Sequence, residues 1–212
     1  SSVSHMGFVM LGLYAFNEVG VTGGVMQMIN HGLTTGGLFL LIGFIYDRTH
    51  TRQISRYGRI WAVVPVFASL FLIVTLGSIG LPGTNGFVGE FLILLGAFRA
   101  HPWAAVVATT GVVLGAAYML TMYKHVIFGP LKHPENEKLV DLNGREVLAV
   151  APIVVLILWM GIYPRPFLAR IEPSVDLLLS RLEKAGATRY LVRSEDLPAP
   201  ADERIALRRR IP

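Results

Sequence analysis

One segment determines how this chain folds: Gly80-Leu81-Pro82-Gly83-Thr84-Asn85-Gly86-Phe87-Val88-Gly89-Glu90. Glu90 is the only charged residue between Arg59 and Arg99. Glycine and proline interrupt helices, and this leaves backbone groups that lipid does not hydrogen-bond. Ionisable groups inside membrane segments are costly and by default belong to ion or proton pathways. The segment therefore predicts a broken transmembrane helix beside a functional carboxylate.

The rest of the chain has the composition of a polytopic membrane protein. Of its 212 residues, 53% are hydrophobic and 16% are charged, whereas soluble domains carry about 25% charged residues. Uncharged windows cover 1–17, 19–46, 60–89, 102–123 and 147–163. Because a spanning helix needs roughly 20 mostly apolar residues, we predict an all-α membrane protein with about five transmembrane helices.

We expect a transmembrane helical region over 1–166, with spans at about 1–16, 22–46, 61–98, 103–123 and 147–163. A continuous helix over 61–98 would extend about 60 Å, twice the hydrocarbon core of about 30 Å. Positive residues collect in the loops 47–59 and 124–145, and positive loops favour the cytoplasmic side. Both loops then lie on the cytoplasmic side, so an even number of crossings separates them. Because 103–123 is one crossing, 61–98 counts as the other, a single crossing broken near 80–86.

The two ends of the chain differ from this pattern. The first residues already lie in an apolar stretch without a signal-peptide pattern, so we expect the C-terminal part of a longer membrane protein. Apolar residues at helical spacing over 167–186 predict an amphipathic helix on the membrane or on a partner. We expect 187–212 to be an irregular charged tail on the outer side, although its basic residues fit that side poorly.

The sequence also excludes several kinds of chemistry on this chain. It contains no cysteine, which rules out cysteine-ligated iron–sulfur clusters, disulfides and thiol catalysis. We find no P-loop, dinucleotide-binding fingerprint or metal-ligand cluster. The net charge of +5 comes from loops and the tail, so it does not indicate nucleic-acid binding. We therefore expect no cofactor, metal ion or nucleic acid on this chain.

Two histidines lie inside the predicted spans. His31 shares one helix face with Gln27, Thr34 and Thr35, which lie at helical spacing from it. His5 lies in the first span. Because histidine titrates near neutral pH, both are candidates for a proton relay. The alternative for each is a hydrogen bond that only joins helices.

The remaining candidates are also open to two interpretations. Glu90 is either the carboxylate of a proton path or a structural group held by the start of the second half-helix. Lys124 and His125 end the fourth span, where a snorkelling lysine and an interfacial histidine are common; the alternative is the cytoplasmic mouth of a path. The repeats Gly32-xxx-Gly36 and Gly111-xxx-Gly115 predict close helix packing.

Several motifs, taken together, resemble the antiporter-like subunits of respiratory complex I, the proton-translocating NADH–quinone oxidoreductase. The motifs are Ser4-His5-Met6-Gly7-Phe8, His31-Gly32-Leu33, Leu81-Pro82-Gly83, Gly86-Phe87-Val88-Gly89-Glu90-Phe91 and Tyr123-Lys124-His125-Val126-Ile127-Phe128-Gly129. The resemblance covers about residues 1–166 and excludes the Arg-rich extension after about 186. Sister subunits tend to carry lysine in place of Glu90, so the resemblance is strongest to the branch called subunit M.

The resemblance implies a fourteen-helix subunit, of which this chain would hold the end of the tenth helix and the next four, the twelfth being discontinuous. It places the family's relay groups on His5, His31 and Glu90. It also implies proton translocation driven by electron transfer in partner subunits, which carry NADH, FMN, iron–sulfur clusters and quinone. The implied neighbours are other antiporter-like subunits and a long lateral helix. The implied location is the inner (plasma) membrane, which the chain would cross several times, and the resemblance favours a bacterial over an organellar source.

Two further interpretations stay open at this point. One is a subunit of a multi-subunit Na⁺/H⁺ antiporter or of a membrane-bound hydrogenase, which share the fold. The other is a structural membrane scaffold in which Glu90 only holds the broken helix.

Overall fold

The computed structural model describes residues 1–130 and 134–185, and these residues form helices joined by short links, without a β-strand among them. The α-helices of this part are α1 (Ser2–Leu13), α2 (Glu18–Thr49), α3 (Pro65–Ser78), α4 (Asn85–Ala100), α5 (Pro102–Tyr123), α6 (Gly144–Ile162) and α7 (Arg165–Lys184). Single turns form η1 (Ile54–Arg56), η2 (Ile60–Ala62), η3 (Lys124–Phe128) and η4 (Pro134–Lys138). The tail expected at 187–212 lies outside the described residues.

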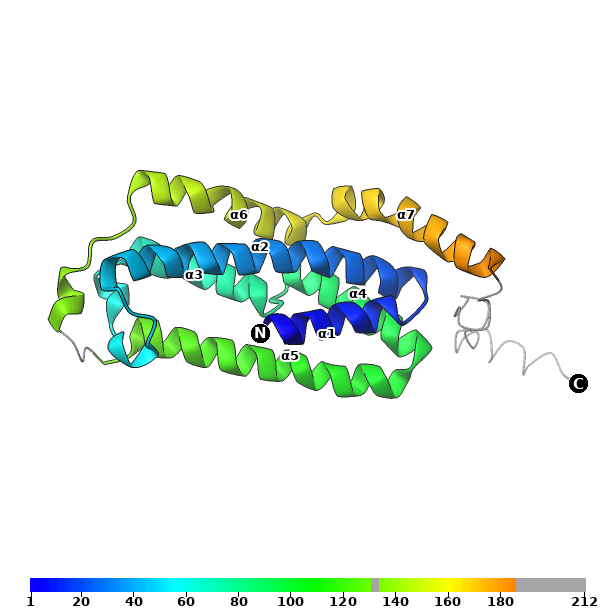
Figure 1. Ribbon diagram of the computed structural model, residues 1–212, viewed down its shortest axis with the longest axis horizontal. Helices are drawn as coiled ribbons and strands as arrows, with labels where there is room; N and C mark the ends of the chain where they lie inside the picture. Colours follow the sequence, from blue (N-terminus) through cyan, green and yellow to red (C-terminus); the bar gives the residue numbers. More distant parts are fainter. Residues whose placement is uncertain (131–133, 186–212) are drawn as a thin grey trace, which may run out of the picture.

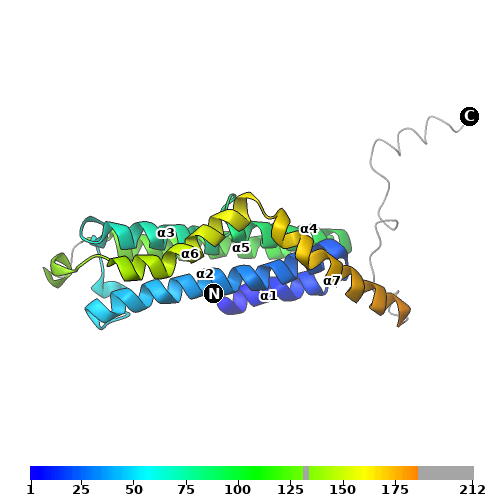
Figure 2. The ribbon, with the colours of Figure 1, turned by 90° about the horizontal axis from the view of Figure 1, so that it is seen from above.

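The central helix of the bundle is α2, which contacts α1, α3, α4, α6 and α7. Figure 1 shows α3 and α4 following one another along α2, with α5 below them and α6 above. Figure 2 shows the same helices lying lengthwise in a flattened bundle, with α7 continuing past its end. Within the described residues, Glu18–Thr49, Pro102–Phe128 and Gly144–Ile162 are long and apolar enough to cross a membrane by length and composition.

The expected break lies between α3 and α4. Helix α3 ends at Ser78 and α4 begins at Asn85, so the non-helical link is 79–84, slightly earlier than the 80–86 predicted from the sequence. Gly80 and Gly83 have φ angles of +69° and +93°, a region that glycine reaches readily and other residues rarely. Together they let the chain leave one helix and begin the next in nearly the same direction (Figure 1).

Glycines hold α2 and α4 unusually close together. A Cβ atom on Gly96 of α4 would overlap the backbone of Gly20 on α2, and one on Gly23 would lie 2.7 Å from the backbone nitrogen of Ile93. Small residues at such contacts are typical of helix packing in membranes. This contact fixes α4, the helix that carries Glu90, against α2, the helix that carries His31.

The opposite end of the bundle is held by two acidic side chains. The carboxylate of Asp141 accepts hydrogen bonds from the backbone N–H groups of Val66 and Phe67 at 2.8 and 3.0 Å. Arg48, near the end of α2, donates to the two carboxylate oxygens of Glu146 at 2.9 and 2.7 Å. Because the first N–H groups of a helix have no partner inside it, Asp141 stabilises the start of α3 from a distant part of the chain.

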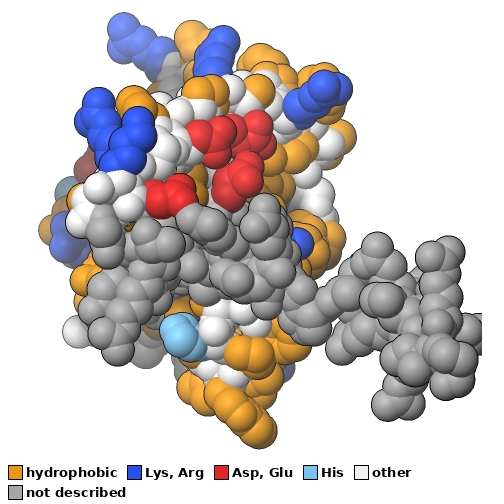
Figure 3. All heavy atoms as spheres, turned by 90° about the vertical axis from the view of Figure 1, so that its right-hand side faces the viewer, with side chains coloured by type: hydrophobic (Ala, Val, Ile, Leu, Met, Phe, Trp, Pro, Cys, Tyr) orange, Lys and Arg blue, Asp and Glu red, His pale blue; other side chains and the backbone are white. Residues whose placement is uncertain are grey.

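Helix α7 is amphipathic in its packing. Ile171 and Val175 are buried against Val21, Met26 and Met160, while its charged side chains are exposed. Figure 3 faces this end of the molecule and shows acidic and basic side chains gathered in the upper part of the view, with hydrophobic side chains along its right and lower edges.

Candidate functional site

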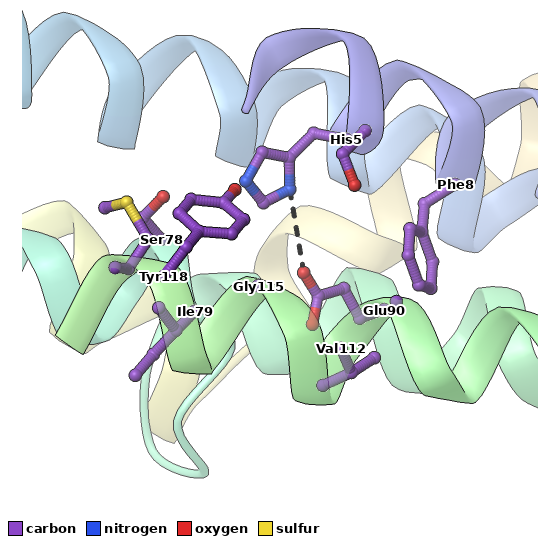
Figure 4. A pocket seen from close by; sticks show the side chains of 11 residues that line it. His5, Phe8, Ser78, Ile79, Glu90, Val112, Gly115 and Tyr118 are labelled. Carbon is purple, nitrogen blue, oxygen red and sulfur yellow. Dashed lines mark ion pairs between the residues drawn. The ribbon is translucent and has the colours of Figure 1, made fainter. Parts of the chain in front are cut away.

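A small cavity beside the helix break contains the main candidate residues. Helices α1, α4 and α5 and the end of α3 contribute its lining, which includes Ser4, His5, Ser78, Glu90 and Tyr118 (Figure 4). The volume open to the centre of a water-sized sphere is about 20 Å³. One water molecule needs roughly 10–15 Å³ by this measure and two to four polar partners. The cavity is therefore large enough and polar enough for a single water molecule.

Glu90 lies on the inner side of α4, where it is 7% exposed. Its carboxylate rests directly on the link between the two half-helices, because a Cβ atom on Gly80 would overlap Glu90 Oε2. Gly80 is thus required twice, once for its positive φ angle and once for the space that it leaves. The break and the carboxylate are in contact, so a change in one changes the position of the other.

His5 and His31 continue from Glu90 as one row of side chains. His5 Nδ1 lies 3.7 Å from Glu90 Oε1, a distance suited to an ion pair but long for a direct hydrogen bond. The rings of His5 and His31 have their centroids 5.5 Å apart. Thr35 Oγ1 hydrogen-bonds to His31 Nδ1 at 3.0 Å. The structure therefore brings together four residues named from the sequence: Thr35, His31, His5 and Glu90.

Gln27 and Thr34 do not join this row, although they lie at helical spacing from His31. Both are buried: Gln27 lies against Gly89 of α4, and Thr34 lies against Gly77 of α3. Asn30 Nδ2 donates to Gln27 Oε1 at 3.3 Å, and Thr34 Oγ1 donates to the carbonyl oxygen of Asn30 at 2.9 Å. The single polar face expected on α2 is divided into a histidine side and an amide side.

Lys124 and His125 lie away from the cavity. Both are exposed in η3, and the ring of His125 donates from Nδ1 to the carbonyl oxygen of Thr121 at 2.7 Å. Neither residue lines the cavity around Glu90. Of the glycines and proline expected at the break, Gly80, Pro82 and Gly83 lie in the link, whereas Gly86 lies in the first turn of α4.

Sequence reasoning missed four residues near the site: Ser78, Tyr118, Asn30 and Asn85. Ser78 and Tyr118 line the cavity, and the hydroxyl of Tyr118 donates to Ser1 Oγ at 3.0 Å. Asn30 and Asn85 contact each other across α2 and α4. A signal for the pair was present, since each is a polar amide within a predicted span. Their partnership was not visible because 55 positions separate them.

The described residues contain no group of three or more histidine, cysteine, aspartate or glutamate side chains placed to hold a metal ion. The polar side chains at the cavity are instead proton donors and acceptors: the imidazole of His5, a carboxyl group and hydroxyls, with the ring of His31 next to that of His5. Such a set fits the movement of protons between buried groups.

The chain is similar to known membrane proteins. Residues 1–115 match the family described as NADH:quinone oxidoreductase/Mrp antiporter, TM. The chain is 47% identical over 179 residues to NADH-quinone oxidoreductase subunit M of Rhodobacter capsulatus, covering 84% of this chain and 35% of that protein. It is 45% identical over 179 residues to NADH-ubiquinone oxidoreductase chain 4 of Marchantia polymorpha, covering 84% of this chain and 36% of that protein.

A solved structure shows the same arrangement of helices. The chain superposes on a chain of respiratory complex I from Thermus thermophilus with bound NADH at a TM-score of 0.76 and 38% identity, covering 83% of this chain and 37% of that one. The chain thus spans about a third of the length of the relatives that it matches. It belongs to the NADH:quinone oxidoreductase/Mrp antiporter family of transmembrane proteins.

Proposed function

We propose that this chain forms part of a membrane-arm subunit of NADH–quinone oxidoreductase and moves protons through a buried relay of His31, His5 and Glu90. The observation that carries the proposal is the 3.7 Å approach of His5 Nδ1 to Glu90 Oε1 beside the helix break. His31 extends the row on the other side of His5. The subunit M and chain 4 relatives, at 47% and 45% identity, support the assignment to this complex.

The proposed mechanism uses the coupling between two neighbouring charges. In a medium of low dielectric constant, an imidazolium and a carboxylate about 4 Å apart stabilise each other strongly. A proton that arrives on His5 therefore favours loss of the proton from Glu90, and the two groups titrate as a pair. A water molecule in the cavity would bridge them. Glu90 would release its proton toward the outer side.

Energy for these steps would come from electron transfer in partner subunits that carry NADH, FMN, iron–sulfur clusters and quinone. Neighbouring antiporter-like subunits and a long lateral helix would pass the change in charge along the membrane arm. The chain would therefore act as one translocating part of a redox enzyme without carrying out the redox reaction. We place it in the inner (plasma) membrane of a bacterium, crossing several times, with α3 and α4 as one interrupted crossing between the spans α2 and α5.

The Glu90→Gln substitution tests the proposal in the complete complex. Glutamine keeps the size of the side chain but does not release a proton, so we expect the number of protons pumped per NADH to fall. The measurement is proton uptake into inside-out membrane vesicles together with the rate of NADH oxidation. The conservative Glu90→Asp variant, which keeps a carboxyl group, serves as the control and should retain part of the pumping.

Unchanged pumping in Glu90→Gln at a normal rate of electron transfer would contradict the transport role and favour the scaffold interpretation. The second candidate function is a subunit of an Na⁺/H⁺ antiporter or a membrane-bound hydrogenase, because the matched family description includes the Mrp antiporter. Proton movement that requires a sodium gradient and continues without NADH oxidation would favour the antiporter.

A further inference from the structure

A second buried polar contact joins α2 to the first residue of α4. Asn30 Nδ2 donates to the backbone carbonyl oxygen of Asn85 at 2.7 Å. In the reverse direction, Asn85 Nδ2 lies 3.5 Å from the carbonyl oxygen of Asn30. The two asparagines are only 1% and 0% exposed. Because a buried amide is costly unless it is hydrogen-bonded, this contact, which we call the asparagine pair, strongly specifies how the two helices meet.

The surroundings of the asparagine pair are shaped to allow it. A Cβ atom on Gly89 of α4 would overlap Gln27 Oε1 and lie 2.9 Å from Asn30 Nδ2. Glycine at position 89 therefore lets the amide of Asn30 come close to the α4 backbone. On the preceding side, the link 79–84 contains two left-handed glycines, which restrict the direction of the chain less than other residues do. The asparagine pair thus fixes the start of α4 where the link alone would leave it free.

The asparagine pair also has a fixed relation to the relay. Asn85 begins α4, and Glu90 follows it by about one and a half turns. Asn30 directly precedes His31 on α2, whose ring contacts His5. Helix α2 therefore carries His31, a relay group, on one side and Asn30, which binds the first residue of α4, on another. A shift of the first turn of α4 would change the distance between His5 and Glu90.

We propose that Asn30 is a positioning residue for Glu90: its amide fixes the first turn of α4 on α2 and so holds the carboxylate within reach of His5. Asn30 does not carry the proton and acts through the backbone of Asn85. The inference rests on the proposed proton-relay function of Glu90.

The Asn30→Leu variant of the complete complex tests this role. Leucine has a similar size but donates no hydrogen bond, so the variant loses the bond to the Asn85 carbonyl and the longer one to Gln27 Oε1. Loss of the shorter bond alone changes a two-state population about fivefold. We expect this chain's contribution to the protons pumped per NADH to fall about fivefold, while NADH oxidation and the amount of assembled complex remain normal. We also expect the pH for half-maximal pumping to shift, because a displaced Glu90 would change its distance from the titratable groups that face it. These are His5 and Tyr118, with His31 behind His5.

Two comparisons make the test specific. Thr22→Val is the matched control, since Thr22 lies on the same helix, is 5% exposed and its hydroxyl makes no hydrogen bond within the described residues. It should leave pumping and its pH profile unchanged. Asn85→Ala removes only the longer of the two contacts, so its effect should be smaller than that of Asn30→Leu. If Asn30→Leu does not assemble, Asn30→Ser replaces it, because serine is too short to reach the carbonyl of Asn85.

The outcomes separate this inference from the proposed function. Suppose that Glu90→Gln loses pumping, whereas the Asn30 variant keeps a normal number of protons pumped per NADH and a normal pH profile. This result would overturn the inference about Asn30 but not the proposed function. A parallel decrease of NADH oxidation, assembly and pumping in the Asn30 variant would also overturn it, because it would show a merely structural role. Normal pumping in Glu90→Gln would instead overturn the relay on which the inference rests.

Discussion

At the scale of single residues, the position of Glu90 depends on a glycine ten positions earlier. Gly80 has a φ angle of +69°, and its missing side chain leaves the space that the carboxylate occupies. The sequence indicated both residues as important, but only as a helix breaker and a buried charge. The structure adds that they are in direct contact. A substitution at the break should therefore act on the carboxylate as well as on the backbone.

Gly80→Ala should lower proton pumping strongly, because the added methyl group would displace the carboxylate of Glu90. The left-handed backbone adds a strain of roughly 1–2 kcal/mol. Gly83→Ala is the matched control, since Gly83 also has a positive φ angle but nothing lies within 4 Å of its added Cβ atom. We expect Gly83→Ala to reduce stability with a smaller loss of pumping per NADH. Equal loss in both variants would argue against the contact.

His31→Ala should interrupt the row of titratable groups beyond His5, whose ring centroid lies 5.5 Å away. We expect fewer protons per NADH with electron transfer maintained, measured in the same vesicles. Thr35→Val removes the hydrogen bond to His31 Nδ1 but leaves the imidazole in place, so its effect should be smaller. Full coupling in His31→Ala would favour the interpretation that His31 only joins helices.

At the scale of helices, the sequence located the break but not the contacts that make it useful. Glycine and proline between two apolar segments predicted an interruption near 80–86, and the observed link is 79–84. Of the repeats Gly32-xxx-Gly36 and Gly111-xxx-Gly115, only Gly111 packs against another helix in the described part of the chain. A Cβ atom there would lie 3.2 Å from the ring of Phe8 on α1, whereas nothing lies within 4 Å of one added to Gly32, Gly36 or Gly115. Spacing alone does not show which side of a helix meets another helix, because that depends on the whole bundle.

The polar side chains of α2 show the same limit. Helical spacing correctly placed His31 and Thr35 together, since their contact is local to α2. It also grouped Gln27 and Thr34 with them, whereas Gln27 lies against Gly89 of α4 and Thr34 against Gly77 of α3. Contacts within one helix follow from helix geometry, but contacts between distant positions need the tertiary structure.

The start of α3 offers a test at this scale. Asp141→Ala removes the acceptor for the backbone N–H groups of Val66 and Phe67. Loss of a cap typically costs about 1 kcal/mol, so we expect a lower unfolding temperature of the purified complex and less assembled protein. Glu172→Ala is a suitable control, because Glu172 is exposed on α7. An unchanged unfolding temperature in Asp141→Ala would contradict the capping role.

At the scale of the whole molecule, α7 lies against the start of α2 through a small apolar contact. Ile171 is buried there, whereas Leu177 on the same helix is 52% exposed. We expect Ile171→Asp to detach α7 and reduce the yield of assembled complex, because an unpaired charge in this contact would be costly. Leu177→Asp should have little effect on yield. Similar yields for both variants, measured by native gel, would show that α7 does not depend on this contact.

The depth of Glu90 in α4 has an electrical consequence. Ten residues of α4, 91–100, follow the carboxylate before the helix ends, and they extend about 15 Å, or half of a hydrocarbon core of about 30 Å. A proton released from Glu90 toward that end would cross about half of the membrane voltage. The work would be about 1 kcal/mol for each 100 mV. In the proposed relay, a rising membrane potential would therefore oppose this release step directly.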